Sequence, residues 1–471
     1  MTNTVPATNG SRARRKPTGR ETAIGEQKHK RTGIDVALGL LTPIVGQEFL
    51  DKYHLRDPLN RTLRYGVKTG FSVAGATTRQ FKRVQGLRGP SRLGARGARG
   101  TDYFDLTPDD DQKLILETVE QFAREVVRPA AHDADEAAAY PRDLTAKAAE
   151  LGITALNVPE DLDGIAAQRC NVTNVLVAEA LAYGDMGLAL PILAPGGVAA
   201  ALTYWGSADQ QATYLKEFTG KNVPPACVAI AEPHPLFDPT TLRTIAVRTP
   251  SGYRLEGVKS LVPAAADAEL FIVGAQFHGK PTLFIVESSA AGLTVKPDPS
   301  MGLRAAALGR IELDKVSVPL SARLGGDDIA PADSARSYSE AIALCRLGWA
   351  ALAVGTSHAV LDYVVPYVKE REAFGEPIAH RQSVAFMCAN IAIELDGLRL
   401  VTWRGAARAE QGLPFGREAA LAKRLGADKG MQIGLDGVQL LGGHGYTKEH
   451  PVERWYRDLR AIGVAEGVLV I

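Results

Sequence analysis

Three zones with different hydrophobic patterns follow one another along the 471-residue chain. From Leu106 to about Gly220, apolar residues recur at spacings of three and four, which predicts a helical first domain. A helix start is expected near Thr107, because this residue would serve as a cap, Pro108 would stand in the first turn, and the aspartates that follow would interact favourably with the helix dipole. The apolar face of this first helix is expected to hold Leu114, Ile115, Val119, Phe122 and Val126.

The pattern changes at Pro224 to short segments rich in Val, Ile, Phe and Leu, separated by Gly and Pro turns. These segments are "GYRLEGVKSLV", "ELFIVGAQF", "PTLFIVESS", "LTVKP" and "RIELDKVSV". They predict a small antiparallel β domain that ends near Gly325. After Ala330 the helical pattern returns, with long helices expected over 337–370, 381–412 and 417–441. The fold class is therefore α+β.

A basic extension precedes these zones. Residues 1–100 hold 20 Lys and Arg against 6 Asp and Glu, a net charge of +14, although the whole chain carries only +1. We expect mixed, partly helical sequence between Arg31 and Gln85, followed by the linker "GLRGPSRLGARGARG". The predicted domains are 1–101 for the partly disordered basic extension and linker, 102–223 for the helical domain, 224–328 for the β domain, and 329–471 for a C-terminal helical bundle.

The role of this extension stays open between several readings. A solvated tail is the simplest, while its Arg-rich, acid-poor start also suits an organelle transit peptide. Peripheral contact with a membrane surface, or an acidic partner, fits the charge equally well. A nucleic-acid role is not expected, because no aromatic residues are interleaved with residues 12–31. We expect a cytoplasmic, bacterial protein, with the mitochondrial matrix as the alternative.

Composition narrows the class of protein. With 45% hydrophobic and 23% charged residues, the chain has the composition of a soluble globular protein. The longest apolar run considered, Val36–Gly46, is too short to cross a bilayer, so we predict no transmembrane segment. Four separated cysteines and nine histidines show no metal-ligand spacing, so we predict no metal and a reducing compartment.

Three motifs carry a resemblance to the acyl-CoA dehydrogenase family of flavoenzymes, over about 102–471. "YVKEREAFGEPIAHRQ" (Tyr367–Gln382) resembles the family's arginine-aromatic-glycine signature. "DGVQLLGGHGYTKEHPVERWYRDLR" (Asp436–Arg460) is similar to its C-terminal signature. "AEPHPLFDPTTLRT" (Ala231–Thr244) resembles a degraded flavin loop. Their order around a central β domain makes the resemblance specific. It implies an N-terminal helical domain, a middle small β-barrel and a C-terminal four-helix bundle.

The resemblance implies a reaction and a base. An acyl-CoA thioester would become a trans-2-enoyl-CoA, with Glu466 removing the α-proton and a hydride passing to flavin N5. Glu466 suits this role if the apolar residues Ile462, Val464, Ala465 and Val468 surround it, because burial raises the pKa of a carboxylic acid. Gly467 would relieve crowding beside the substrate. Arg346 should lie near the base and the acyl-CoA site. Some subfamilies carry their base at the position directly before this arginine, but here that position is Cys345, and a cysteine is a poor substitute for that base. Without the motifs, Glu466 would be interpreted as an exposed carboxylate near a chain end.

The same resemblance implies FAD as cofactor. The matching residues are Arg371, Phe374, Gln382, Gln439, Gly442 and Gly443. An arginine binds a pyrophosphate with two parallel hydrogen bonds, and glycines let the backbone approach a phosphate closely. In the family these groups come partly from a neighbouring subunit, so a homodimer or homotetramer is implied. An electron-transfer flavoprotein would be the electron acceptor, and an acyl-CoA oxidase is a smaller possibility.

Several positions depart from the family pattern. Residues that the family uses to hydrogen-bond or stack on the flavin ring are replaced here by Ala231, Phe237, Leu261 and Pro263. The residue after Gly467 is Val468, where the family usually has a threonine. Each lost hydrogen bond weakens binding by about 1 kcal/mol, so two or three lower FAD affinity by one or two orders of magnitude. A second hypothesis follows: a flavin-poor, non-catalytic or partner-dependent subunit of a hetero-oligomeric acyl-CoA dehydrogenase.

Overall fold

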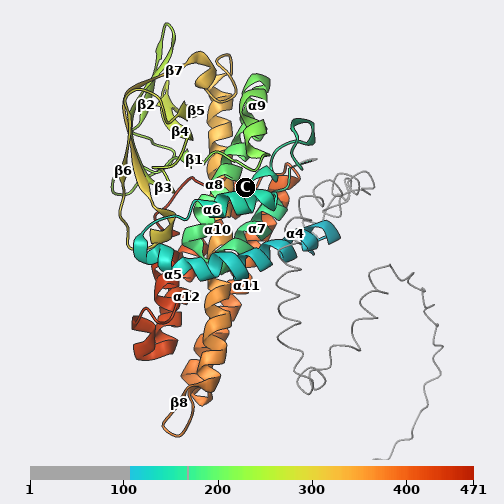
Figure 1. The fold of residues 1–471 in the computed structure, drawn as a ribbon, viewed down its shortest axis with the longest axis vertical. Coiled ribbons are helices and arrows are strands. Elements are labelled where there is room, and N and C mark those ends of the chain that lie inside the picture. Colours follow the sequence, from blue (N-terminus) through green and yellow to red (C-terminus); the bar gives the residue numbers. More distant parts are fainter. Residues whose placement is uncertain (1–106, 167–168) are drawn as a thin grey trace, which may run out of the picture. The chain divides into compact units, whose positions relative to one another are not determined.

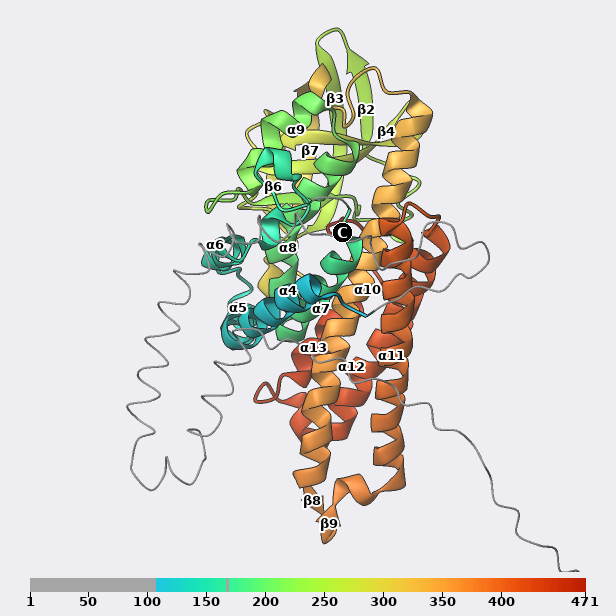
Figure 2. The same ribbon diagram turned by 90° about the vertical axis from the view of Figure 1, so that its right-hand side faces the viewer.

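The computed structural model describes residues 107–166 and 169–471. The chain divides into two units, Met1–Ser72 and Val73–Ile471, and every described residue belongs to the second. The predictions for 1–101 therefore lie outside the described residues. Figures 1 and 2 show the described part as a group of helices, a β-sheet and a second group of long helices, so the predicted α–β–α order is confirmed.

The first group contains six α-helices. Their bounds are α4 (Asp110–Phe122), α5 (Arg128–Ala137), α6 (Asp143–Glu150), α7 (Asn171–Gly184), α8 (Met186–Trp205) and α9 (Ala208–Tyr214). A π-helical segment, Ala123–Val127, joins α4 to α5. Helices α7 and α8 are buried on almost every side, as expected for helices that are apolar all round. They form the core of this part.

The start of α4 differs from the prediction by two residues. Asp109, not Thr107, is the N-cap: its carboxylate accepts the Gln112 backbone N–H at 2.8 Å, and the Gln112 side chain accepts the Asp109 N–H at 3.0 Å. This capping box satisfies two amides that the helix leaves unpaired. On the predicted apolar face Val119 and Phe122 are buried, but Leu114 is 50% exposed, since it lies off the packed stripe.

Helix α8 was overlooked as an apolar run. Met186–Trp205 holds no charged residue, and by length and composition it is able to cross a bilayer, as is the long helix α10 (Pro331–Glu370). In the fold, however, the most apolar 18-residue stretch of each helix is packed inside the protein: 89% of it is buried in α8 and 83% in α10. The prediction that no run reaches this length is therefore wrong, while the packing identifies both as core helices.

The middle part is one seven-stranded sheet. Its strands are β1 (Ala226–Ala229), β2 (Ile245–Thr249), β3 (Gly252–Val262), β4 (Leu270–Phe277), β5 (Lys280–Glu287), β6 (Leu293–Pro297) and β7 (Gly309–Pro319). The order is β1-β4-β2-β3-β7-β6, with β5 paired to β4. Five of these strands match the predicted segments within one or two residues. The two short strands β1 and β2 were missed, because four or five residues give little periodicity.

The sheet is mixed, not purely antiparallel as predicted. β1 pairs with β4 in parallel over Ala226–Ala229, and Ile245 of β2 makes a single parallel pairing with Gln276. The hairpin β4–β5 and the long pairing of β3 with β7 are antiparallel. A parallel pairing needs a crossover connection, and β2 and β3 provide it between β1 and β4.

Three long helices and one short helix form the last part. They are α10, α11 (Gln382–Glu410), α12 (Gly416–Leu441) and α13 (Val452–Ala461), and the predicted long helices are confirmed. At 40 residues, α10 is about 60 Å long. It packs against α11 and α12, and also against α7 and β5, so it joins all three parts (Figure 2). A two-stranded hairpin, β8 (Glu372–Ala373) and β9 (Glu376–Pro377), follows its end.

A buried ion pair fixes the sheet against the loop that follows β1. Lys259 Nζ lies 2.9 Å from Glu232 Oε1, and the two side chains are 0% and 2% exposed. The Glu232 carboxylate also accepts the backbone N–H groups of Arg243 at 2.7 Å and Thr244 at 2.9 Å. Burial favours protonation of Glu232, but the Lys259 ammonium and these hydrogen bonds outweigh burial and lower its pKa to about 2. The carboxylate is therefore ionised and fully partnered.

Removing one member of this pair should destabilise the protein strongly. We expect K259M to cost about 3–5 kcal/mol, because it leaves a buried carboxylate without its cation. The Glu232 contribution to stability is present above its ordinary pKa of 4.5 and is lost as the pH falls towards 2. Chemical denaturation at pH 7 measures the loss of stability.

The matched control is K296M, which breaks the exposed pair between Lys296 and Glu312 in the same sheet. It should cost less than about 1 kcal/mol. The double variant K259M/E232Q should lose less stability than the sum of its single changes, because neither charge is left unpaired. Equal unfolding midpoints for K259M and K296M would show that the buried pair contributes nothing.

Candidate active site

Glu466 lies in the segment that follows α13, and the packing of α13 sets its position. Arg454 of α13 forms an ion pair with Asp185, the buried N-cap of α8, with Nε 2.9 Å from Oδ2. The Asp458 carboxylate accepts the Leu303 backbone N–H. Burial, followed by repulsion from Asp185, raises the pKa of Asp458 well above its usual range. These contacts hold α13 against α8 and the sheet domain, so the residues after it are held as well.

The Glu466 side chain is bound by Arg346, from the middle of α10. Arg346 Nη2 donates to Glu466 Oε1 at 3.1 Å, and Nε lies 3.2 and 3.3 Å from the two carboxylate oxygens. The Glu466 side chain is 13% exposed and that of Arg346 is 30% exposed. This contact fixes the direction of the carboxylate, since the guanidinium and the carboxylate are both planar. The predicted proximity of Arg346 to Glu466 is thus present.

The backbone on both sides of Glu466 is also held by side chains. Lys423 Nζ of α12 donates to the carbonyl oxygen of Ala465, and Trp349 Nε1 of α10 donates to that of Gly467 at 2.9 Å. Gly467 has a φ of +82°, and a Cβ at that position would stand 2.7 Å from Ile230 Cγ1. A side chain there would clash with Ile230, which directly follows β1, so glycine is required by packing as well as by conformation.

The apolar surround predicted for Glu466 is only partly present. Ile462, Ala465 and Val468 are buried at 0%, 2% and 3% exposure, but Val464 is 67% exposed. Val464 points away because Ala461–Ala465 closes as a helical turn after α13, with the Ala465 N–H bonded to the Ala461 carbonyl at 2.9 Å. Cys345 is fully buried, and burial raises the pKa of its thiol. It is therefore protonated at neutral pH.

The loop and strand that carry the departures from the flavin pattern lie beside this carboxylate. Ile230, which contacts Gly467, is followed directly by Ala231, whose side chain is buried and apolar. On β3 the Leu261 N–H donates to Asp298 Oδ2 at 3.0 Å, and Asp298 also accepts the Ser260 hydroxyl. The Pro263 carbonyl accepts the Cys227 thiol at 3.0 Å. The Leu261 N–H, the Ser260 hydroxyl and the Pro263 carbonyl are thus already partnered within the chain.

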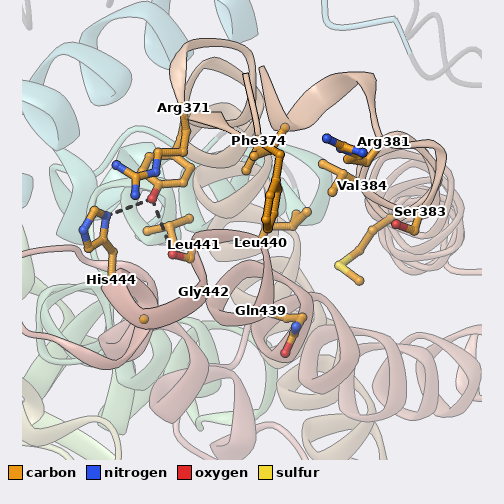
Figure 3. Close-up of a pocket in the computed structure, with 14 residues that line it drawn as sticks. Arg371, Phe374, Arg381, Ser383, Val384, Gln439, Leu440, Leu441, Gly442 and His444 are labelled. Atoms are coloured by element: carbon orange, nitrogen blue, oxygen red, sulfur yellow. Dashed lines mark hydrogen bonds between the residues drawn. The ribbon is translucent and has the colours of Figure 1, made fainter. Parts of the chain in front are cut away.

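A second site lies at the far end of α10. A cavity of about 640 Å³ opens between the end of α10, the β8–β9 turn, the start of α11 and the end of α12 (Figure 3). Five of the six predicted cofactor residues line it: Arg371, Phe374, Gln439, Gly442 and Gly443. Gln382 is exposed as the first residue of α11 and lies outside this lining.

The shape of this cavity suits a phosphate-bearing ligand. Gly442 ends α12 with a φ of +57°, and a Cβ at Gly443 would meet nothing within 4 Å, so the backbone there is open to close approach. The exposed guanidinium of Arg371 lies in the same cavity. Phe374 is 96% exposed and has a φ of +58°, a conformation that is uncommon for a bulky residue. These features fit the diphosphate and an aromatic portion of a dinucleotide cofactor such as FAD.

Residues that the sequence analysis missed also line the two sites. Tyr367, one helical turn before Arg371, donates to His444 Nδ1 or accepts from it at 2.8 Å, and Arg381 stands 5.7 Å from the centre of the Phe374 ring. Residues four positions apart lie on the same face of a helix, so the position of Arg371 would have indicated that Tyr367 faces the same cavity. Lys423 follows the buried Ala419 at the same spacing, which places a lysine on the packed face of α12.

The structure does not bring the two sites together within one chain. Arg346 and Arg371 are 25 positions apart on α10, which corresponds to about 37 Å along the helix axis. The Gly442 turn lines the cavity with Arg371, whereas Glu466 is bound by Arg346, so the two sites lie at different places along this helix. Among residues 107–166 and 169–471, no cluster of three or more His, Cys, Asp or Glu side chains is arranged to hold a metal ion.

Comparison with known proteins gives the same order of three domains along the chain. Three family models match: the N-terminal domain of acyl-CoA dehydrogenase at 109–221, the middle domain at 227–316 and the C-terminal domain at 335–469. An acyl-CoA dehydrogenase of Bacillus subtilis (strain 168) is 30% identical over 364 residues, covering 76% of this chain and 94% of the relative.

Solved structures give the same result. Butyryl-CoA dehydrogenase from Megasphaera elsdenii is 27% identical with a TM-score of 0.70, covering 77% of this chain and 96% of that one. A chain in the structure "Electron transferring flavoprotein of Acidaminococcus fermentans: Towards a mechanism of flavin-based electron bifurcation" is 26% identical with a TM-score of 0.71, covering 77% and 96%. The chain therefore belongs to the acyl-CoA dehydrogenase family, flavoprotein oxidoreductases that act on CH–CH bonds.

Proposed function

We propose that this protein oxidises an acyl-CoA thioester to a trans-2-enoyl-CoA, with Glu466 as the base. One observation supports the proposal most: a carboxylate that is 13% exposed is fixed by a guanidinium from a helix of the protein core. A base that must remove a weakly acidic proton needs a fixed direction and little water around it. Glu466 meets both requirements.

The residues of this chain would divide the reaction between them. Arg346 keeps the carboxylate aimed while the substrate is absent. An acyl chain would displace the remaining water around this carboxylate, and a carboxylate without water is a stronger base. The Cα–H bond then breaks with its proton passing to a Glu466 oxygen, the Cβ–H bond breaks as hydride, and a C=C bond forms between the two carbons. FAD, when bound, supplies the acceptor for that hydride.

We propose that FAD is held by residues of two copies of the chain. Arg371 and the Gly442–Gly443 backbone would bind the diphosphate, with Phe374 and Gln439 beside them, while Glu466 of the other copy would serve the ring. The distance of about 37 Å along α10 between Arg346 and Arg371 supports this division. Gln382 stays a prediction, because it lies outside the cavity lining. A homodimer is the smallest assembly that completes the site, and a homotetramer also meets the requirement.

The relatives support a substrate class and an electron acceptor for this proposal. The Megasphaera elsdenii neighbour is a butyryl-CoA dehydrogenase, which supports a short acyl-CoA as the first substrate to test. The neighbour from the Acidaminococcus fermentans structure supports an electron-transferring flavoprotein as the acceptor. An acyl-CoA oxidase would instead consume oxygen, so oxygen uptake against acceptor reduction separates the two.

The flavin-ring side favours a second candidate, a flavin-poor or partner-dependent subunit. Ala231 offers no hydroxyl, Pro263 has no N–H, and the Leu261 N–H is already bonded to Asp298 at 3.0 Å. Fewer free donors therefore face a flavin ring than the family pattern provides. Loss of two or three hydrogen bonds lowers affinity without removing the diphosphate site.

Replacement of the base should abolish the reaction without loss of the fold. We expect E466Q to reduce the rate of flavin bleaching by butyryl-CoA at least about 100-fold, because an amide does not accept the α-proton. Stopped-flow absorbance of the flavin measures this rate. The control E117Q changes an exposed carboxylate of α4 and should leave the rate unchanged. Normal turnover of E466Q would exclude this residue as the base.

Co-expression of two defective variants should restore activity. R371A lacks the arginine of the diphosphate site and E466Q lacks the base, so each alone should be inactive. A hybrid dimer contains one site in which both residues are wild type, so turnover should reappear in the purified mixed oligomer. R336A, at the other end of α10, is a control that should retain both activity and FAD. An inactive hybrid would place both residues in one copy's site.

The flavin content decides between the two candidate functions. We expect gentle purification to yield a yellow protein, with FAD that is lost on dilution because its dissociation constant is raised by one or two orders of magnitude. The ratio of flavin to protein absorbance, before and after added FAD, measures this. A colourless protein that binds no added FAD would support the non-catalytic subunit and contradict the enzyme.

A further inference from the structure

We propose that Lys423 is a positioning residue for Glu466: with Trp349, it holds the two peptide carbonyls that flank the base and so sets where the carboxylate stands. The inference rests on the proposed function of Glu466. Neither Lys423 nor Trp349 belongs to the three sequence motifs, and both come from helices outside the segment that carries the base.

The contacts form a clamp on three consecutive residues. Lys423 Nζ donates to the Ala465 carbonyl, and Trp349 Nε1 donates to the Gly467 carbonyl at 2.9 Å. Arg346 binds the carboxylate of the residue between them. The segment is therefore held at its backbone on either side and at its side chain. A helix-borne donor is a firm support, because the helix itself is fixed by packing.

The clamp residues also contact each other. Lys423 Nζ lies 5.5 Å from the centre of the Trp349 ring, and Trp349 is 1% exposed. Trp349 follows Arg346 by three positions, so α10 presents both to the same segment. Lys423 follows the buried Ala419 by four positions on α12. A shift of either helix would move the base.

Lys423 also has an electrostatic effect on the base. A buried ammonium is costly unless an opposite charge is near. Burial lowers the pKa of Lys423 to about 8, while the Glu466 carboxylate opposes this and Arg346 adds to it. The positive charge of Lys423 and the negative charge of Glu466 therefore stabilise each other. Loss of the ammonium should favour protonation of Glu466.

Other charged or titratable groups face the same place and set the background. Those on α10 are Arg346, Cys345 and Tyr338, and those in the loop after β1 are Glu232 and Asp238. Burial raises the pKa of Tyr338, and the negative charges of Glu232, Glu466 and Asp238 raise it further. Of these groups, Cys345 also interacts with Lys423, whose charge lowers the pKa of the thiol against the larger effect of burial, which raises it. Because this thiol is protonated at neutral pH, the pH profile of a Lys423 variant reports the contribution of that one charge.

The test compares K423M, K423R and K429M as FAD-loaded proteins. We expect K423M to lower kcat by about 10- to 100-fold, since a small displacement of a base is costly, while KM for butyryl-CoA changes less than about threefold. The acid limb of kcat/KM should move to higher pH, because protonation of Glu466 becomes easier. K423R keeps the charge and should recover the position of this limb.

K429M is the matched control from the same helix. Lys429 pairs with Glu394 of α11 at 2.6 Å, away from Glu466, so its loss should leave kcat and the pH profile unchanged. An unchanged pH limb and kcat in a folded K423M protein would overturn the positioning role. A loss of kcat in K423M with no shift of the limb, and no recovery in K423R, would also overturn it, since that pattern fits a structural role.

A measurement without turnover separates this inference from the proposed function. The infrared carboxyl band of Glu466, isolated as the difference between wild type and E466Q, should titrate at higher pH in K423M than in its parent. If E466Q is fully active, the proposed function fails whatever this titration shows. If E466Q is inactive and the band titrates identically with and without Lys423, the inference fails and the base assignment remains.

Discussion

The packing of α10 is the constraint on which the rest of the structure depends. One helix of 40 residues contacts α7 of the first part, β5 of the sheet, and both α11 and α12. Its middle is apolar and buried on nearly every side, so rotation or sliding of the helix would disrupt close-packed contacts. Arg346 and Trp349 project from this buried middle, and Arg371 stands at its end. The helix thus fixes two chemically different sites at once.

Several buried charges in the described part of the chain lie in ion pairs. Three of these pairs join segments that are far apart in sequence: Lys259 with Glu232, Arg454 with Asp185, and Arg346 with Glu466. The first two pairs are almost completely removed from water, and their role is to fix loops and helices. The third keeps 13% of the Glu466 side chain and 30% of the Arg346 side chain exposed. That residual access distinguishes a carboxylate able to meet a substrate from one that serves the fold.

The two ends of the C-terminal signature serve different sites, and this explains its unusual composition. Its glycines make an open turn at Gly442 and Gly443, while its charged end forms α13, where Arg454 and Asp458 fasten the helix to α8 and the sheet domain. Glu466 follows that anchored helix after one further turn. A motif that is continuous in sequence therefore lines the cavity beside Arg371 at its start and anchors the segment that carries Glu466 at its end.

The sequence by itself determined the order of the three parts and the long helices, because these depend on local periodicity. Its motifs also named five residues that line one cavity and the residue that contacts Glu466. Five of the seven strands also followed from local pattern. Only the tertiary structure decided the rest. It showed that β1 pairs in parallel, that Val464 points outward, that Gln382 lies outside the cavity, and that Arg346, the partner of Glu466, is separated from Arg371 along one helix. Lys423 and Trp349 were invisible in sequence, since a hydrogen bond to a backbone carbonyl leaves no motif. Such contacts arise from the packing of distant segments, which no local pattern records.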